Sequence, residues 1–462
     1  MTRSSTRLLL TAGLILLAPS PAVAQTTDGR WNLDDALETP DWLHVGGSFV
    51  TRFESLGERL AAGATGNDRG LFTRLLLEVG IRDTFTEVFA ELIDSRLSNE
   101  APGSVATFRR VDALELLQGY AAFRFTDAFA DDDQLRVLVG RHTMDVGSRR
   151  FIARNRYRNT INSFLGVNAT WKGAGGSTAR AFYTLPTRIL PRDSDTLLDG
   201  TPRNNEESRA VRFYGAVFET PDVGLASRGE FYALGLFETD RPDVATRNRR
   251  LTTLGTRIFR KPEVDAFHWE FESALQFGTS RASASAAEDL DHEAWFQHAH
   301  AGYTFGGPHE LRAELLFDVA SGDRDGGDGD NNRFDSLFGV PRFEYGATGF
   351  FRPIARANIL SPGVRFFANV GARGRLSLIH RLGYVASRSD RSSNGLTDPT
   401  GGAGRHIGDL TEVVWKQPIG DGSTNLEFGL AYFSEGGFTE SAPESVGPGH
   451  AWFGYAQVKW LF

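Results

Sequence analysis

Apolar and polar residues alternate one by one along many segments of the chain. In 266–278, Phe267, Phe271 and Leu275 fall on one face, and Glu270 and Glu272 fall on the other. The same period of two runs through 71–82, 310–319, 424–432 and 452–462. Because successive side chains of a strand point to opposite faces, this pattern predicts β-strands with one apolar and one polar face.

These segments are about ten residues long, which is the length that a tilted strand needs to cross a bilayer. Further segments of this kind lie near 44–54, 114–124, 164–172, 207–218, 250–260, 293–305, 363–370 and 376–386. Short turns such as 304–308 alternate with long polar connections such as 187–206, 279–292, 321–334 and 387–404. The pattern predicts an all-β fold over residues 42–462: a transmembrane antiparallel up-and-down barrel of about 18 strands with a polar lumen.

A soluble secreted β-protein that binds carbohydrate also alternates in this way, so the alternation alone does not decide. Two further features favour the membrane. Aromatic residues gather at the predicted strand ends, as interfacial belts require: Trp171, Tyr303, Phe305, Tyr384, Trp415, Trp452 and Trp460. The chain also ends on a predicted strand with Phe462 on its apolar face, and this terminus resembles the outer-membrane assembly signal, which implies recognition by the barrel-assembly machinery.

The first 24 residues have the three parts of a secretory signal peptide. Arg3 and Arg7 supply positive charge, residues 8–18 are mostly apolar, and Ala22-Val23-Ala24 is a small-residue cleavage site. We expect cleavage after Ala24, a lead-in over 25–41, and export to the outer membrane of a Gram-negative bacterium, with lipid around the barrel.

Composition narrows the function. The 462 residues contain no cysteine, which excludes disulfides, thiolate metal sites and a thiol nucleophile. The formal net charge of −8 argues against nucleic acid as a partner. Of the 50 basic residues only four are lysine, so 46 are arginine. An arginine on the lipid face costs about 2–4 kcal/mol near the bilayer midplane, so arginines on alternating strands are expected to face the lumen.

Several motifs occur in one order along the chain. They are Arg52-Phe53-Glu54, Thr73-Arg74, Ala90–Arg96, Gly140-Arg141-His142, Gly147–Ile152, Asn162, Phe164-Leu165-Gly166, Phe334–Gly339, Ala357–Gly363, Glu435–Phe438 and Tyr455-Ala456-Gln457. Together they resemble the alginate-export family of outer-membrane porins from about residue 42 to the end. His142 and Leu165 stand where the family usually has Gln and Asp. The resemblance implies a monomeric channel that passes an alginate-like polyuronate or a similar anionic or polar saccharide by diffusion, without a cofactor.

The predicted substrate pathway follows from the polar faces. Arginines raise the local concentration of anions and pair with carboxylates through a planar fork, acids between them keep each site weak, and tyrosines offer rings on which sugars stack. The residues expected to line the pore are Arg52, Glu54, Arg74, Glu78, Glu91, Asp94, Arg96, Tyr120, Arg141, Arg149, Arg150, Arg154, Arg212, Tyr214, Arg257, Glu270, Arg312, Glu314, Arg365 and Tyr455. The charged residues from Arg149 to Arg158 all have the same sign, and apolar and polar residues alternate irregularly there. One interpretation is a constriction loop that folds into the barrel.

Other interpretations stay open. Arginine–glutamate pairs across strands also satisfy one another without a substrate. The channel could instead take up small carboxylates or sugars. Asp323, Asp325, Asp328 and Asp330 suggest a calcium loop, although the calcium-loop patterns fit incompletely and a solvated loop is expected. His298 and His300 share a strand face, but no third metal ligand is evident from the sequence. The chain has no G-x-S-x-G or H-E-x-x-H motif, so an outer-membrane hydrolase is less favoured than a channel.

Overall fold

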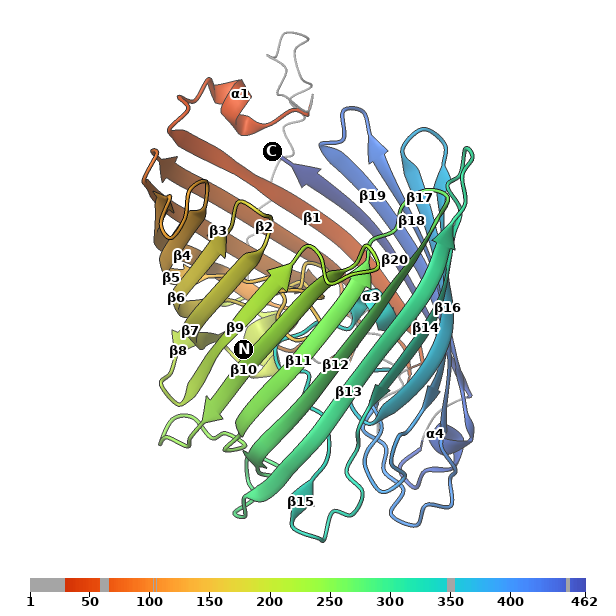
Figure 1. Cartoon of the computed structure of the whole chain (residues 1–462). Helices are drawn as coiled ribbons and strands as arrows, with labels where there is room; N and C mark the ends of the chain where they lie inside the picture. Colours follow the sequence, from red (N-terminus) through yellow and green to blue (C-terminus); the bar gives the residue numbers. More distant parts are fainter. Residues whose placement is uncertain (1–29, 59–65, 103, 105, 347–353, 446–448) are drawn as a thin grey trace, which may run out of the picture.

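The computed structural model describes residues 30–58, 66–102, 104, 106–346, 354–445 and 449–462. The expected signal peptide, residues 1–24, and the first part of the expected lead-in lie outside the described residues. In the described chain, 18 strands of nine residues or more form one closed antiparallel barrel (Figure 1). The predicted fold class and strand number are therefore confirmed.

The strands follow the chain in order, each paired with the next. They are β1 (Leu43–Gly57), β2 (Asp68–Arg82), β3 (Thr86–Ser98), β4 (Asp112–Thr126), β5 (Gln134–His142), β6 (Phe164–Lys172), β7 (Thr178–Arg188), β9 (Val211–Thr220), β10 (Arg228–Glu238), β11 (Arg250–Arg260), β12 (Ala266–Ser280), β13 (Leu290–Thr304), β14 (Arg312–Ala320), β16 (Ile359–Val370), β17 (Gly374–Tyr384), β18 (His406–Ile419), β19 (Thr424–Glu435) and β20 (His450–Leu461). The two-residue strands β8 (Glu206–Glu207) and β15 (Asp330–Asn331) lie in loops.

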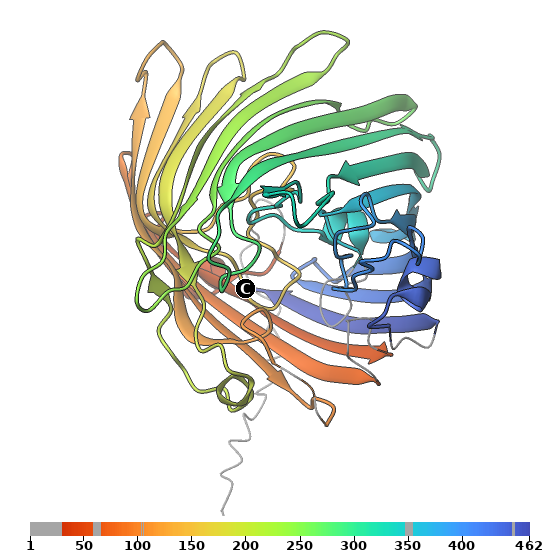
Figure 2. The same ribbon diagram turned by 90° about the horizontal axis from the view of Figure 1, so that it is seen from below.

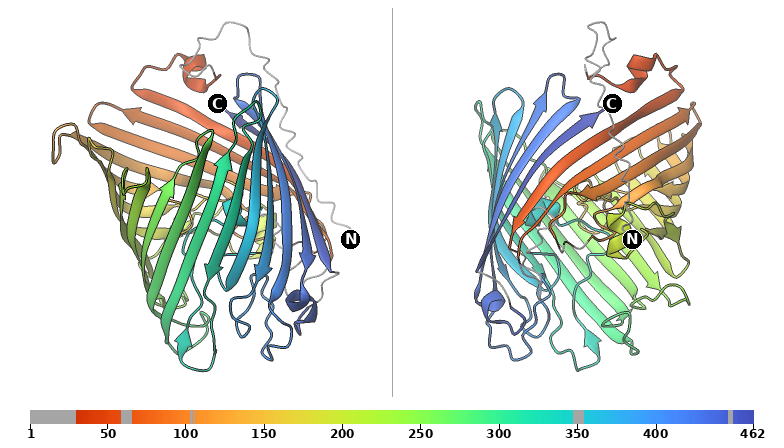
Figure 3. Two further views of the ribbon diagram at one scale, coloured as in Figure 1. Left: turned by 45° about the vertical axis from the view of Figure 1, so that its right-hand side comes forward. Right: turned by 180° about the vertical axis from the view of Figure 1, so that it is seen from behind.

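The barrel closes where β1 meets β20. Their register runs from Ser48 opposite Leu461 to Gly57 opposite Trp452. At the end of the seam, the Gly47 N–H donates to the Phe462 carbonyl oxygen at 2.7 Å, and the Phe462 N–H donates back at 3.1 Å. Figure 3 shows β1 and β20 side by side from behind. Closure leaves no unpaired strand edge, which a wall in lipid requires.

Connections differ at the two ends of the barrel. At the end where β1 begins and β20 ends, the strands are joined by short turns such as 83–85, 371–373 and 420–423. At the other end the connections are long, above all 143–163, 321–358 and 385–405. Outer-membrane barrels have short periplasmic turns and long extracellular loops, so the long loops lie on the outer side of the membrane.

Among the described residues, four short helices precede or connect the strands. They are α1 (Leu33–Leu37), α2 (Ser194–Leu198), α3 (Arg342–Tyr345) and α4 (Gly437–Ser441). The first is capped by Asn32 and sits near the start of β1, where Asp34 accepts from the Val45 N–H at 2.7 Å. No helix among the described residues is long and apolar enough to cross a membrane.

The outward face is apolar, as the alternation predicts. On β12, Phe267, Phe271 and Leu275 are exposed to lipid, whereas Glu270 and Glu272 are buried inside. Aromatic rings gather near both ends of the wall. Phe267 and Phe305 flank Tyr303, each with ring centroids 4.8 Å from it, at the turn end, and Tyr432 packs on Trp452 at 4.4 Å at the loop end. These clusters fit the two interfacial belts of a membrane barrel.

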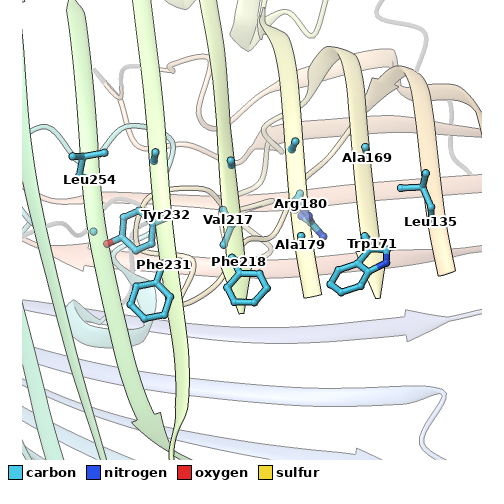
Figure 4. A pocket seen from close by; sticks show the side chains of 14 residues that line it. Leu135, Ala169, Trp171, Ala179, Arg180, Val217, Phe218, Phe231, Tyr232 and Leu254 are labelled. Atoms are coloured by element: carbon cyan, nitrogen blue, oxygen red, sulfur yellow. The ribbon is translucent and has the colours of Figure 1, made fainter. Parts of the chain in front are cut away.

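The outer wall also carries a shallow apolar groove of about 580 Å³ across β5, β6, β7, β9, β10 and β11 (Figure 4). Trp171, Phe218 and Phe231 lie along it, and alanines on neighbouring strands form much of its floor. Because most of these side chains point away from the lumen, the groove faces hydrocarbon and is not a candidate site for a polar solute.

Candidate functional site

The loop between β5 and β6, residues 143–163, folds into the barrel instead of standing above it. Figure 2, viewed along the barrel from the loop end, shows loop segments inside the ring of strands. Arg74 on β2 donates to the Arg158 oxygen at 2.7 Å and to the Arg156 oxygen at 3.0 Å. Arg52 on β1 donates to the Tyr157 oxygen at 2.8 Å. The wall therefore holds this loop by its backbone.

The same loop reaches the opposite wall through Arg150. Its guanidinium pairs with Glu270 at 2.5 Å, with Glu272, and with Glu344 at 3.1 Å. Burial alone would lower the pKa of Arg150, but Glu270, Glu344 and Glu272 outweigh burial and raise it well above its usual value. Arg150 thus carries a permanent charge that fastens the loop to β12.

A second inward loop, residues 334–346 of the connection between β14 and β16, meets the first one. Ile152 pairs with Phe338 in a parallel bridge, and the Phe338 N–H donates to the Phe151 oxygen at 2.9 Å. Gly339 lies so close that a Cβ atom there would stand 1.7 Å from the Arg150 carbonyl oxygen. The two motifs that carried the sequence resemblance, 147–152 and 334–339, therefore touch inside the barrel.

Helix α3 anchors this second loop to the strands near the seam. Arg342 pairs with Glu412 on β18 at 2.8 Å and donates to the Tyr455 hydroxyl on β20 at 2.7 Å. That hydroxyl donates in turn to Glu427 on β19 at 2.7 Å. The Arg342 guanidinium is thus fixed by Glu412, Glu427 and Tyr455, and these contacts hold α3 against this wall.

The inward loops leave two adjoining cavities in the lumen. The first, of about 790 Å³, is bounded by β1, β2, β3 and β17 to β20, and ten basic and four acidic side chains line it among the described residues. The second, of about 490 Å³, is bounded by β11 to β18, with seven basic and two acidic side chains. Arg149, Arg375 and Lys416 border both cavities. Both spaces are therefore strongly cationic, and they meet at three basic residues.

Half of the predicted pore residues border these cavities. Those are Arg74, Glu78, Glu91, Arg149, Arg150, Arg154, Arg257, Glu270, Arg312 and Arg365. Another five point inward but are held in packed hydrogen-bonded clusters: Arg52, Glu54, Tyr120, Glu314 and Tyr455. The inward-folded loop that was one interpretation of the 149–158 stretch is present.

Two predicted pore residues on β3 lie on the wrong face. Asp94 and Arg96 share the outward parity of Leu92, which is 43% exposed. They pair with each other at 2.9 Å near the loop end of the strand. Their inward neighbours are Ile93 and Leu97, which pack in apolar clusters that include loop residues such as Ile161 and Leu197.

Arg212 and Tyr214 on β9 were also predicted to line the pore, but they lie on the outward face of the wall. Tyr214 is 42% exposed on the lipid side, where it stacks on Tyr183, and Arg212 shares its parity. Phe213 is buried inside, against Phe338 of the second inward loop. An aromatic residue faces the lumen here because the loop offers it an apolar partner, so the rule that polar residues face inward fails.

Arg141 borders neither cavity. It sits at the end of β5 between Glu115 at 2.7 Å and Glu207 at 2.6 Å. Its charge is used to hold the β7–β9 loop, with Asn205 nearby. Arg141 is therefore a loop anchor in this structure.

Several cavity residues were missed from the sequence. They are Arg30, Tyr157, Arg342, Arg373, Arg375, Lys416 and Lys459. Arg375, Lys416 and Lys459 belong to alternating strands, and their polar-face positions could have revealed them. Arg342 lies in a long loop, where no periodicity reports which way a side chain points.

The suspected calcium loop shows no converging carboxylates in the described residues. Asp325 accepts from the Gly327 N–H at 3.1 Å, and Asp328 accepts from the Asp330 N–H at 2.9 Å. Asp325, Asp328 and Asp330 are exposed, and Asp323 is half-buried. Each bond of this kind closes a local turn, as expected for a solvated loop.

A closed 18-stranded barrel with an apolar outer wall and a polar, loop-narrowed interior is an outer-membrane porin channel. The family model for alginate export matches residues 41–451. The chain belongs to the alginate export family. No curated protein matches this chain at a significant level.

Solved porin structures share this fold. The outer membrane protein OpdK of Pseudomonas aeruginosa is 13% identical, with a TM-score of 0.56 over 91% of this chain and 98% of that one. OccK2 (OpdF) of the same organism, in complex with glucuronate, is 12% identical, with a TM-score of 0.56 over 90% and 98%. A BenF-like porin from Pseudomonas fluorescens Pf-5 is 11% identical, with a TM-score of 0.56 over 91% and 99%. At these identities the likeness is one of fold.

Proposed function

We propose that this porin passes carboxylate-bearing saccharides, alginate-like uronates or similar sugars, by diffusion through the two cationic cavities. The observation that carries the proposal is the lining of the first cavity, in which ten basic side chains outnumber four acidic ones. Arginine keeps its charge at any physiological pH and pairs with a carboxylate through two parallel hydrogen bonds. No covalent step is part of the proposal.

The connection between the cavities supports a stepwise path. Arg149, Arg375 and Lys416 border both spaces, so an anion leaving one cavity meets the same cations that line the next. Acids beside them, such as Glu270 and Glu427, offset part of the charge and keep each site weak enough for release. The barrel presents a complete lumen in one chain, which supports a monomeric channel.

A second candidate is uptake of small carboxylates. It is favoured by the two inward loops, which divide the lumen into spaces of about 790 and 490 Å³. The relative OccK2 (OpdF) was solved with glucuronate, a single uronate sugar. Both candidates use the same cationic lining and differ in the length of the solute.

The test is planar-bilayer recording combined with liposome swelling. We expect an anion-selective current, and faster swelling with glucuronate than with glucose; cation selectivity would refute the proposal. Replacing Arg149, Arg375 and Lys416 together by Gln should reduce anion selectivity. Arg212→Gln is the matched control, because Arg212 lies on the outer face. Oligoglucuronates of increasing length then separate the saccharide from the small-carboxylate candidate.

A further inference from the structure

Three metal-ligating side chains from neighbouring strands meet on the inner face of the wall. They are His268 on β12, His300 on β13 and Glu314 on β14, and one ligand atom of each lies within 4.8 Å of the others. His268 Nε2 is 3.1 Å from Glu314 Oε1. His268 and Glu314 are buried, whereas His300 is half-buried and borders the 490 Å³ cavity. The cluster therefore has access from the lumen.

A glycine creates the space in which these groups meet. Gly302 on β13 lies opposite both His268 and Glu314 in the strand register. A Cβ atom at Gly302 would stand 2.7 Å from His268 Nε2 and 2.7 Å from Glu314 Cγ. Any larger residue would push the imidazole and the carboxylate apart, so the absence of a side chain here is what lets them approach.

The third ligand is oriented by a chain of polar contacts. His300 Nδ1 lies 3.0 Å from His298 Nε2, and His298 Nδ1 lies 2.7 Å from Asp318 Oδ1. A ring whose Nδ1 is engaged by a partner has its Nε2 directed and ready for another one. Carboxylate–histidine arrangements of this kind orient the ligands of protein metal sites. His298 and Asp318 are thus positioning residues for His300.

We infer that His268, His300 and Glu314 bind one divalent transition-metal ion of the Zn²⁺ class. Two imidazoles and one carboxylate are a known zinc ligand set, with a fourth position left open. At zinc–ligand distances of about 2.0–2.2 Å, the ligand atoms of a tetrahedral ion lie about 3.3 Å apart. The 3.1 Å separation of His268 Nε2 and Glu314 Oε1 fits this spacing closely. Of the three ligands, His300 borders the cavity, so an ion can reach the cluster from the lumen.

A second set of possible ligands shares His300 with the first. The hydrogen bonds of the two carboxylates favour the first set. Glu270 with His298 and His300 also brings three ligand atoms together. However, Glu270 gives one oxygen to Arg150 and the other to Arg257, each at 2.5 Å. Glu314 gives Oε2 to Arg365 at 2.6 Å, and its Oε1 faces His268.

One cation competes for that oxygen. Arg312 Nε lies 3.0 Å from Glu314 Oε1, so a metal ion must displace it. Arg312→Ala is therefore expected to strengthen metal binding. This effect has the opposite sign from that of removing a ligand, which helps to separate a true site from a general loss of structure.

The experiment is titration of the purified, metal-stripped barrel with Zn²⁺ by calorimetry, with Co²⁺ absorption as a report on ligand geometry. We expect one Zn²⁺ per chain and a tetrahedral Co²⁺ spectrum. His268→Ala, His300→Ala and Glu314→Gln should each weaken binding by more than about tenfold, and the positioning variant His298→Ala by about 10–100-fold. His309→Ala is the control, because His309 sits in an exposed turn bonded to the Asn369 oxygen.

Heat-modifiable migration on gels checks that each variant is a folded barrel. The inference is overturned if the wild-type barrel binds no Zn²⁺, or if folded His268→Ala and His300→Ala bind it as tightly as the wild type. Equal losses in His309→Ala would also overturn it, because they would place the ion elsewhere. None of these outcomes depends on which solute the channel carries, so the proposed function stands or falls separately.

Discussion

Ile152 and Phe338 lie in two different loops, more than 180 residues apart in the chain, and they pair in parallel inside the barrel: residue 338 follows residue 152 by 186 positions. The Ala153 N–H donates to the Phe338 oxygen at 3.2 Å, next to the bond from the Phe338 N–H to Phe151. This contact joins the two loops that narrow the lumen, so the width of the channel depends on it.

Adding a side chain at Gly339 is expected to separate the two loops. A Cβ atom there would meet the Arg150 carbonyl oxygen, and overpacking of this kind costs about 1–3 kcal/mol. We expect Gly339→Val to raise single-channel conductance and to reduce anion selectivity, since the loops carry Arg149 and Arg342. Gly326→Ala is the control, because a Cβ at Gly326 meets nothing within 4 Å. Unchanged conductance in Gly339→Val would show that the pairing does not set the pore width.

Acidification is expected to release the second inward loop. Burial alone would raise the pKa of the Glu344 carboxyl, but Arg150 and Arg356 outweigh burial and hold this pKa below its usual value. A carboxyl with a lowered folded-state pKa stabilises the closed loop above the unfolded value of about 4.3, and this contribution is lost as pH falls through the folded value.

Current recorded between neutral pH and pH 3 tests this expectation. The wild-type channel should become noisier and more conductive only below about pH 4.3. Glu344→Gln should behave in this way already at neutral pH, because removing one partner of a buried ion pair costs about 3–5 kcal/mol. Asp325→Asn, in an exposed loop, should follow the wild type. A pH-independent current in the wild-type channel would contradict the role given to Glu344.

An added arginine is expected to cost much more on the lipid face of the wall than on the lumen face. Leu315 on β14 is 69% exposed to lipid, whereas Ser377 on β17 lines the second cavity. Leu315→Arg should lower the free energy of unfolding by about 2–4 kcal/mol in vesicles, and Ser377→Arg should cost less because its charge lies in a polar space. Guanidinium titration of the folded barrel measures both. Equal costs would mean that the two faces are wrongly assigned.

Loss of the terminal residue at the seam between β20 and β1 is expected to impair assembly of the barrel. Phe462 exchanges two backbone hydrogen bonds with Gly47 where β20 meets β1, and recognition of the terminal Phe by the barrel-assembly machinery is a proposal from the sequence. Deleting Phe462 removes both bonds and should reduce the heat-modifiable form in outer membranes. Phe462→Ala keeps the backbone pair, so a defect of equal size in this variant would assign the loss to recognition of the ring.

The sequence predicted the wall well because lipid imposes a simple rule on alternate residues. On β2, β12, β14, β19 and β20 the apolar faces assigned from the sequence point outward. The rule failed on β3 and β9, where Ile93, Leu97 and Phe213 face inward against buried loop side chains. Alternation reports an apolar outer face against a polar lumen, and in these places loop side chains make the lumen apolar.

The residues that line the cavities and form the histidine cluster were harder to predict, because their positions depend on the paths of loops and on the register between strands. Arg149 and Arg154 were found because their stretch is rich in arginine, but Arg342 was missed because its position depends on the path of a long loop. The His268–His300–Glu314 cluster needed the register of three strands, since Gly302 had to fall opposite both outer partners. Local patterns contain no information about such registers.

Side chains of the barrel wall hold the first inward loop through hydrogen bonds to its main chain. Carbonyl oxygens of residues 156–159 accept from Arg74, Arg52 and Ser95 on the wall. Because these donors recognise groups that every residue possesses, the bonds at 156–159 do not depend on which side chains stand there. The side chain of Arg156, which faces the cavity, can therefore change without loss of these bonds, whereas Arg150 and Arg154 also hold the loop through ion pairs to the wall.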